Sequence, residues 1–311
     1  MTVVAGLLMA GLLVAQGADI TPAVIGDSYA SGTGAGEYSD ELCMRSDRSA
    51  AGHAAEFFDT DSINVACNGA WVDDLTEPRV IARNRTDIDL EGNAVDLAAF
   101  HRVLLECGRG MAGASASLEF EENGEAIGVI CTLTLDPQIE ATEEASDIFL
   151  SIGGNDIGFV PVAGACLIQE DEDLCRESVE AAEQALGPAL VSQREAVMAL
   201  QGERPDARIH LVPYPRILDE DSARMIGSYD VGADVTALQE EWEGELRAMA
   251  EDLDISYVET VTPIWEGHGI GAADSWIHMT GNIGELLHPT EEGWRATGTA
   301  LISHLGMTLL P

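Results

Sequence analysis

The chain has 311 residues, of which 46% are hydrophobic, so it can bury a large core and is not disordered as a whole. Acidic residues outnumber basic ones by 55 to 15, and the formal net charge is −40. A surface with this charge repels nucleic-acid phosphates and anionic lipids, which excludes nucleic-acid binding. All fifteen basic residues are arginine. The composition fits adaptation to high salt and, equally, an acidic secreted protein from a G+C-rich genome.

Residues 1–17 have the pattern of an export signal. Residues 3–15 form an apolar run that is too short to span a bilayer, and Ala15, Gln16 and Gly17 resemble a cleavage site. No basic residue precedes the run, so a buried first helix and an uncleaved anchor remain alternatives. We therefore expect a secreted protein whose residues 18–311 form a single monomeric domain without stable insertion into a membrane.

The chain contains six cysteines, and an even number in an exported protein favours disulfides over reduced core thiols. They allow 15 pairings, between which the sequence does not choose. The sequence has no CxxC motif and no histidine at zinc-finger spacing from a cysteine, so no metal is expected.

Short apolar segments rich in β-branched residues alternate with helical patterns along the chain. Predicted strands lie at residues 23–25, 63–66, 147–152, 208–212 and 255–261, and predicted helices at 177–200 and 235–253. This alternation predicts an α/β doubly wound parallel sheet, which binds ligands at the carboxyl ends of its strands. Residues 84–142 fit the pattern least, and we expect them to form an insertion on the same domain, stapled by its own cysteines.

Gly26, Asp27 and Ser28 follow the first predicted strand. A serine at a strand-to-helix turn exposes its hydroxyl beside backbone N–H groups that can hold an oxyanion. The same tripeptide occurs in ordinary turns and helix caps. The glycine-rich residues 31–36 lack the spacing of a nucleotide-binding loop, so no nucleotide cofactor is expected.

Two further segments carry polar groups that suit catalysis. Asn155 follows a glycine pair after the third predicted strand, where its amide can donate a hydrogen bond into a cleft. His288 precedes Pro289, which favours extended backbone and a loop near a strand end. Glu285 lies three residues before His288 and can orient its ring.

Together, Ser28, Gly69, Asn155 and His288 occur in the order of the four sequence blocks of the SGNH (GDSL) hydrolase superfamily. The chain resembles the secreted SEST-like esterase/lipase subgroup of that superfamily. The matching segments are residues 26–32, 66–70, 151–159, 267–269 and 288–290, and they extend over nearly the whole predicted mature chain.

The resemblance implies a three-layer α/β/α sandwich with five parallel strands, the flavodoxin-like SGNH fold. It implies that Ser28 is the nucleophile and His288 the general base, with an oxyanion hole from Ser28 N–H, Gly69 N–H and the Asn155 side chain. It also implies that no cofactor is needed. Three disulfides in chain order are implied as well: Cys43–Cys67, Cys107–Cys131 and Cys166–Cys175.

One position departs from the superfamily pattern, because Glu285 stands where an aspartate is usual. Some relatives orient the histidine with a backbone carbonyl instead, and of the two possibilities we favour the Glu285 carboxylate. The resemblance implies a carboxylic-ester hydrolase acting on a short acyl ester, a lipid or an acetylated sugar. Phe159, Val160 and Val162 slightly favour an acyl chain, and they could equally belong to the core. The alternatives are a carbohydrate O-acetyl esterase and a non-catalytic binding module with the same fold.

Overall fold

The protein is described by a computed structural model, in which residues 20–91, 94–107, 114–122, 126–218 and 225–308 are placed. The predicted export signal, residues 1–17, lies outside the described residues. The chain divides into two compact units. The main unit comprises Met1–Asp73 and Thr142–Pro311, and the insertion unit comprises Asp74–Ala141.

A five-stranded parallel sheet forms the centre of the main unit, in the order β13-β10-β9-β1-β4. Its strands are β1 (Pro22–Gly26), β4 (Ile63–Asn64), β9 (Asp147–Ser151), β10 (Arg208–Leu211) and β13 (Ser256–Tyr257). All five residues of β1 and of β9 are buried, as expected for central parallel strands. Counted along the chain, the strand order is 2-1-3-4-5, the flavodoxin-like order, in which the direction of winding changes between β1 and β9.

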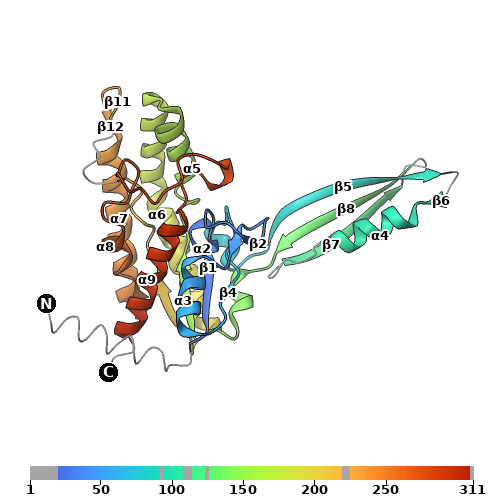
Figure 1. Ribbon diagram of the computed structural model, residues 1–311, viewed down its shortest axis with the longest axis horizontal. Helices are drawn as coiled ribbons and strands as arrows, with labels where there is room; N and C mark the ends of the chain where they lie inside the picture. Colours follow the sequence, from blue (N-terminus) through green and yellow to red (C-terminus); the bar gives the residue numbers. More distant parts are fainter. Residues whose placement is uncertain (1–19, 92–93, 108–113, 123–125, 219–224, 309–311) are drawn as a thin grey trace. The chain divides into compact units, whose positions relative to one another are not determined.

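Helices cover both faces of this sheet (Figure 1). Because crossovers between parallel strands are right-handed, the change of direction sends α3 to one face and α6 and α7 to the other. Accordingly, α3 packs against α9 and β1, while α6 packs against α7. The bounds are α3 (Ala50–Phe58), α6 (Glu172–Glu203), α7 (Val231–Asp252), α8 (Val261–Trp265) and α9 (Glu291–Thr308). The predicted three-layer α/β/α fold is confirmed.

The remaining elements of the main unit are short and lie mostly between a strand and the next long helix. They are α2 (Ser28–Ser31), β2 (Tyr38–Asp40), β3 (Arg45–Ser46), η1 (Val72–Leu75), α5 (Phe159–Ala163), η3 (Gly164–Gln169), β11 (Met225–Ile226), β12 (Tyr229–Asp230) and η4 (Ile283–Glu285). Among the described residues, no helix combines the length and hydropathy that crossing a membrane requires.

The insertion unit contains an antiparallel sheet in the order β6-β5-β8-β7. Its elements are β5 (Arg79–Glu91), β6 (Ala94–Val95), α4 (Leu97–Glu106), β7 (Ala114–Glu122), β8 (Ala126–Leu135) and η2 (Gln138–Thr142). The unit begins ten residues before the predicted insertion, because β5 pairs with β8 from Arg79 onward. A disulfide joins Cys107, which follows α4, to Cys131 on β8.

The other two disulfides lie in the main unit. Cys43 is bonded to Cys67, and Cys166 to Cys175. The chain-order pairing that the resemblance implied is therefore present for all six cysteines. Cys166 lies in η3 and Cys175 in the first turns of α6, so their bond holds η3 against the start of that helix.

Candidate active site

Ser28 lies where the central strands β1 and β9 end side by side. A Cβ atom at Gly26 would lie 1.9 Å from the carbonyl oxygen of Ser151, so only glycine allows the two strand ends to approach this closely. Ser28 then begins α2, and the Asp27 side chain caps this helix by accepting a hydrogen bond from Tyr29 N–H at 2.9 Å. Ser28 is thereby placed at the carboxyl edge of the sheet, at the change of winding direction.

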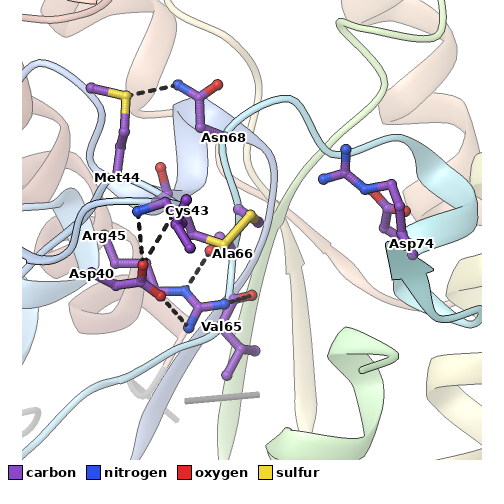
Figure 2. Close-up of a disulfide and its surroundings, with 12 residues drawn as sticks. Asp40, Cys43, Met44, Arg45, Val65, Ala66, Asn68 and Asp74 are labelled. Carbon is purple, nitrogen blue, oxygen red and sulfur yellow. Dashed lines mark hydrogen bonds and ion pairs between the residues drawn. A yellow bond between two sulfur atoms is a disulfide. The ribbon is translucent and has the colours of Figure 1, made fainter. Parts of the chain in front are cut away.

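Gly69 lies on a turn next to Ser28, after β4. Cys67 N–H donates to the Gly26 carbonyl at 3.0 Å, which continues the pairing of β1 and β4 beyond the strand. Figure 2 shows the Cys43–Cys67 disulfide and, beside it, the buried ion pair between Arg45 and Asp40 at 3.3 Å. The Arg45 guanidinium also donates to the carbonyls of Ala66 and Val65. The turn that presents Gly69 is therefore held by a covalent bond and by hydrogen bonds to a buried cation.

Asn155 links the third sequence block to the second. Its Nδ2 donates to the Ala70 carbonyl at 2.8 Å, and the Asp156 carboxylate accepts from Val72 N–H at 3.2 Å. An amide group has two N–H donors, so one donor of Asn155 remains for the cleft. Ser28, Gly69 and Asn155 are thus brought together from three chain segments.

His288 comes from a loop before α9, here called the closing loop (residues 283–290). Its Nδ1 lies 3.0 Å from the carbonyl oxygen of Leu286. Because a carbonyl only accepts hydrogen bonds, Nδ1 carries the proton and Nε2 is the basic nitrogen. Burial lowers the pKa of His288 to about 4, so the ring is neutral and able to accept a proton at neutral pH.

The structure pairs the Glu285 carboxylate with a residue other than His288. The Glu285 carboxylate accepts a hydrogen bond from Tyr38 Oη at 2.6 Å, and the Leu286 carbonyl takes the place beside His288 Nδ1. The physical reason is that Tyr38, whose Oη also accepts from Gly34 N–H at 3.0 Å, offers the Glu285 carboxylate a partly buried hydrogen-bond donor. Of the two possibilities considered from the sequence, the structure has the backbone carbonyl.

All four predicted residues line one cleft of about 450 Å³, as do Asp27, Tyr29 and Tyr214. Phe159, Val160, Ile168 and Ile283 form much of the remaining wall, and the last three are more than half exposed. The cleft thus combines a small polar group of residues with an extended apolar wall. Among the described residues, no group of three His, Cys, Asp or Glu side chains is arranged to hold a metal ion.

Two tyrosines that the sequence analysis missed connect the parts of the site. Tyr214 Oη accepts from Gly154 N–H at 3.0 Å and donates to the Asp27 carboxylate, joining the residues that precede Asn155 and Ser28. Burial raises the pKa of Asp27 to about 7 despite that bond. Tyr29 Oη donates to the Leu287 carbonyl in the closing loop. Tyr214 lies three residues after β10, so its position at a strand end was the available signal.

Two other histidines, which lie between β13 and the closing loop in the chain, have different partners. His268 stacks on Trp276 with 3.4 Å between ring centroids, and its Nδ1 lies 2.8 Å from the Asp274 carbonyl. His278 Nε2 lies 2.9 Å from the Gly34 carbonyl, and His278 N–H donates to the His288 carbonyl. Both residues therefore support the backbone near the closing loop, while His288 lines the cleft.

No protein-family model matches the chain. Among curated proteins, it is 24% identical to Lipase 1 of Streptomyces coelicolor over 313 residues, covering 93% of this chain and 89% of the relative. Among solved structures, it is similar to an extracellular lipase of Streptomyces rimosus (20% identity, TM-score 0.64, covering 91% and 97% of the two chains). It is also similar to a phospholipase A1 of Streptomyces albidoflavus (21%, 0.62, 92% and 98%).

These relatives match almost from end to end, and the solved ones share the fold. The four sequence blocks also lie in order on that fold, each at the carboxyl edge of the sheet. Sequence and fold together support the resemblance to the SGNH (GDSL) hydrolase superfamily, and the relatives that match over most of their length are hydrolases of the lipase type.

Proposed function

We propose that the protein is a secreted carboxylic-ester hydrolase in which Ser28 is the nucleophile and His288 the general base. The observation that carries the proposal is the single cleft lined by Ser28, Gly69, Asn155 and His288. These residues come from four separate segments, and their side chains or N–H groups are those that acyl transfer requires.

In the proposed reaction, Ser28 Oγ attacks the ester carbonyl carbon while Nε2 of His288 takes the hydroxyl proton. The Leu286 carbonyl keeps the proton of the ring on Nδ1 and stabilises the imidazolium that forms. His288 then returns the proton to the departing alcohol, and an acyl-enzyme remains. Water, deprotonated by the same nitrogen, attacks the acyl-enzyme and releases the acid.

The negative charge of each tetrahedral intermediate is held by the N–H groups of Ser28 and Gly69 and by the free N–H of Asn155. The Asn155 amide is already oriented by its bond to Ala70, so little reorganisation is needed during the reaction. One such donor contributes about 3 kcal/mol to transition-state stabilisation. Replacing Asn155 with alanine is therefore expected to lower kcat by about a hundredfold.

The substrate that fits this cleft best is an ester with an apolar acyl chain. Phe159, Val160, Ile168 and Ile283 form a wall on which an acyl chain buries apolar area, which favours a lipid or acyl ester over an acetylated sugar. The names of the relatives, two lipases and a phospholipase A1, point the same way.

The test is hydrolysis of p-nitrophenyl esters from acetyl to palmitoyl by the wild-type protein and by Ser28→Ala. We expect wild-type turnover that increases beyond acetyl, loss of at least a thousandfold in the variant, and unchanged circular dichroism. Covalent labelling by a fluorophosphonate should depend on Ser28. Turnover of acetyl esters alone would indicate the carbohydrate esterase, and no turnover at all would indicate a binding module.

Secretion is supported by the three disulfides, because such bonds persist in oxidising compartments. Expression of the full chain in a bacterium with a Sec pathway should yield protein outside the cytoplasm that begins after residue 17. Protein retained with an intact N-terminus would contradict the cleavage site.

A further inference from the structure

The closing loop places its catalytic histidine next to an unfavourable backbone conformation. Leu287 has a φ of 67°, in the left-handed region that a side chain with a Cβ atom rarely adopts. Three hydrogen bonds hold this turn. Leu287 N–H donates to the His278 carbonyl at 2.8 Å, His288 N–H donates to the Glu285 carbonyl at 3.1 Å, and Tyr29 Oη donates to the Leu287 carbonyl.

Tyr29 differs from the other two donors because it belongs to the nucleophile's helix. It follows Ser28 directly in α2, is 7% exposed, and has its ring centroid 5.1 Å from that of His288. The rings of Tyr214, at 5.0 Å, and Phe159, at 6.2 Å, surround it further. The position of the Tyr29 hydroxyl is therefore determined by the same short helix that presents Ser28.

We infer that Tyr29 is a positioning residue, whose hydroxyl holds Leu287 in its left-handed conformation and thereby sets the place of His288 relative to Ser28. The inference rests on the proposed function of Ser28 and His288. If the bond to Tyr29 is removed, Leu287 is free to return to an extended conformation. Such a change would rotate the peptide next to His288 and move the ring away from the serine.

The test is Tyr29→Phe, which removes the hydroxyl and retains the ring. For a short-chain ester we expect kcat to fall ten- to a hundredfold with KM changed less than twofold, and fluorophosphonate labelling to slow by the same factor. Tyr257→Phe is the matched control. Tyr257 is a buried tyrosine of β13 whose hydroxyl has no hydrogen-bond partner in the described part of the chain, so this variant should behave as wild type.

A double-mutant cycle separates positioning from general stability. Glycine adopts a positive φ without steric cost. In a Leu287→Gly background the left-handed conformation at position 287 therefore depends less on the Tyr29 hydroxyl. In that background, the fold-decrease in kcat caused by Tyr29→Phe should be at least three times smaller than the fold-decrease it causes in the wild type. Equal effects in both backgrounds, or a kcat of Tyr29→Phe within twofold of wild type, would overturn the inference.

A second readout is the acid limb of the pH profile of kcat/KM. Tyr29, His278 and Glu285 surround His288, and loosening the loop exposes the imidazole to water. The acid limb of Tyr29→Phe should therefore move to higher pH, whereas an unmoved limb would count against positioning. The proposed function fails separately, if wild-type turnover does not depend on Ser28.

Discussion

Two regions of the main unit each hold a histidine whose ring nitrogen lies beside an oxygen acceptor, but one region is an open cleft and the other is buried. At the carboxyl edge of the sheet, His288 contacts a backbone carbonyl and lines an open cleft. On β10 and α9, His210 and His304 form a buried cluster with Asp147 of β9. His210 Nε2 lies 3.0 Å from the Asp147 carboxylate, and its Nδ1 lies 3.0 Å from His304 Nε2.

The buried cluster has the better charge partner. Asp147 accepts hydrogen bonds from Arg208 and Ser146 as well, and it is fully buried like His210. Burial alone would raise the pKa of Asp147, but the hydrogen bonds from His210, Arg208 and Ser146 lower it to about 2. A histidine paired with a carboxylate is thus insufficient for a catalytic site, which also needs access to substrate and a nucleophile. The proposed site has a carbonyl in place of the carboxylate, and its histidine lines a cleft together with Ser28.

The largest expected effect is a loss of ester hydrolysis on substitution of His288, which substitution of His304 should not cause. His288→Gln should lower kcat/KM at least a thousandfold, because no base remains to activate Ser28, while thermal unfolding changes little. His304→Gln should leave kcat/KM within twofold of wild type and lower the melting temperature. Ester hydrolysis and differential scanning fluorimetry on both variants measure this. If His304→Gln loses activity without losing stability, the assignment of a structural role to the buried cluster is wrong.

The next effect concerns the buried cluster. Asp147→Asn removes the negative charge that faces Arg208 and His210, and we expect the free energy of unfolding to fall by about 3 kcal/mol. Urea denaturation measures the change, and kcat at a temperature where the variant is folded should equal that of wild type. A stability equal to wild type would show that the cluster is exchangeable for neutral groups.

A smaller effect is the pH dependence of stability. Burial and the nearby His210 lower the pKa of His304 to about 4, below the value near 6.5 of the unfolded chain. Between these values the unfolded state binds more protons, so this group's contribution to stability falls as pH decreases from 6.5 to 4. The difference in unfolding free energy between wild type and His304→Gln should therefore shrink over this window. The pKa of Asp27 is raised to about 7, so the contribution of Asp27 to stability changes with pH in the opposite direction. Because wild type and His304→Gln both contain Asp27, the difference between them removes this contribution.

The smallest expected effect belongs to Glu285. Because its carboxylate accepts from Tyr38 and the Leu286 carbonyl faces His288, Glu285→Gln should keep kcat within about threefold of wild type. Steady-state kinetics at pH 7 decide this. A loss of a hundredfold would restore the carboxylate as the group that orients His288.

Most of the fold could be predicted because its signals are local, and the four residues of the family blocks lie together in one cleft. Strands β1, β9 and β10 are apolar runs closed by turn residues, and Ser28 and Asn155 follow two of them directly. The predicted ends were less accurate for β13, which is two residues long in place of seven, and for α6, which extends beyond both predicted ends and includes Pro188. The ends of edge strands and helices depend on tertiary packing, and the hydrophobic pattern of one segment carries no information about that packing.

By itself, the sequence determined the alternation of strands and helices, the excess negative charge, and the order Ser28, Gly69, Asn155, His288. The first two follow from residue types and spacings along a few neighbouring positions, whereas the significance of the four residues is implied by the resemblance to the SGNH (GDSL) blocks. Only the tertiary structure decided which acceptor faces His288, because Tyr38 lies 247 residues from the Glu285 that it binds. It also decided that Asp147, His210 and His304 meet, and that Tyr29 Oη contacts Leu287 across 258 residues. Such contacts join side chains that are distant in the chain, so their geometry is set by how the layers pack and has no local pattern to reveal it.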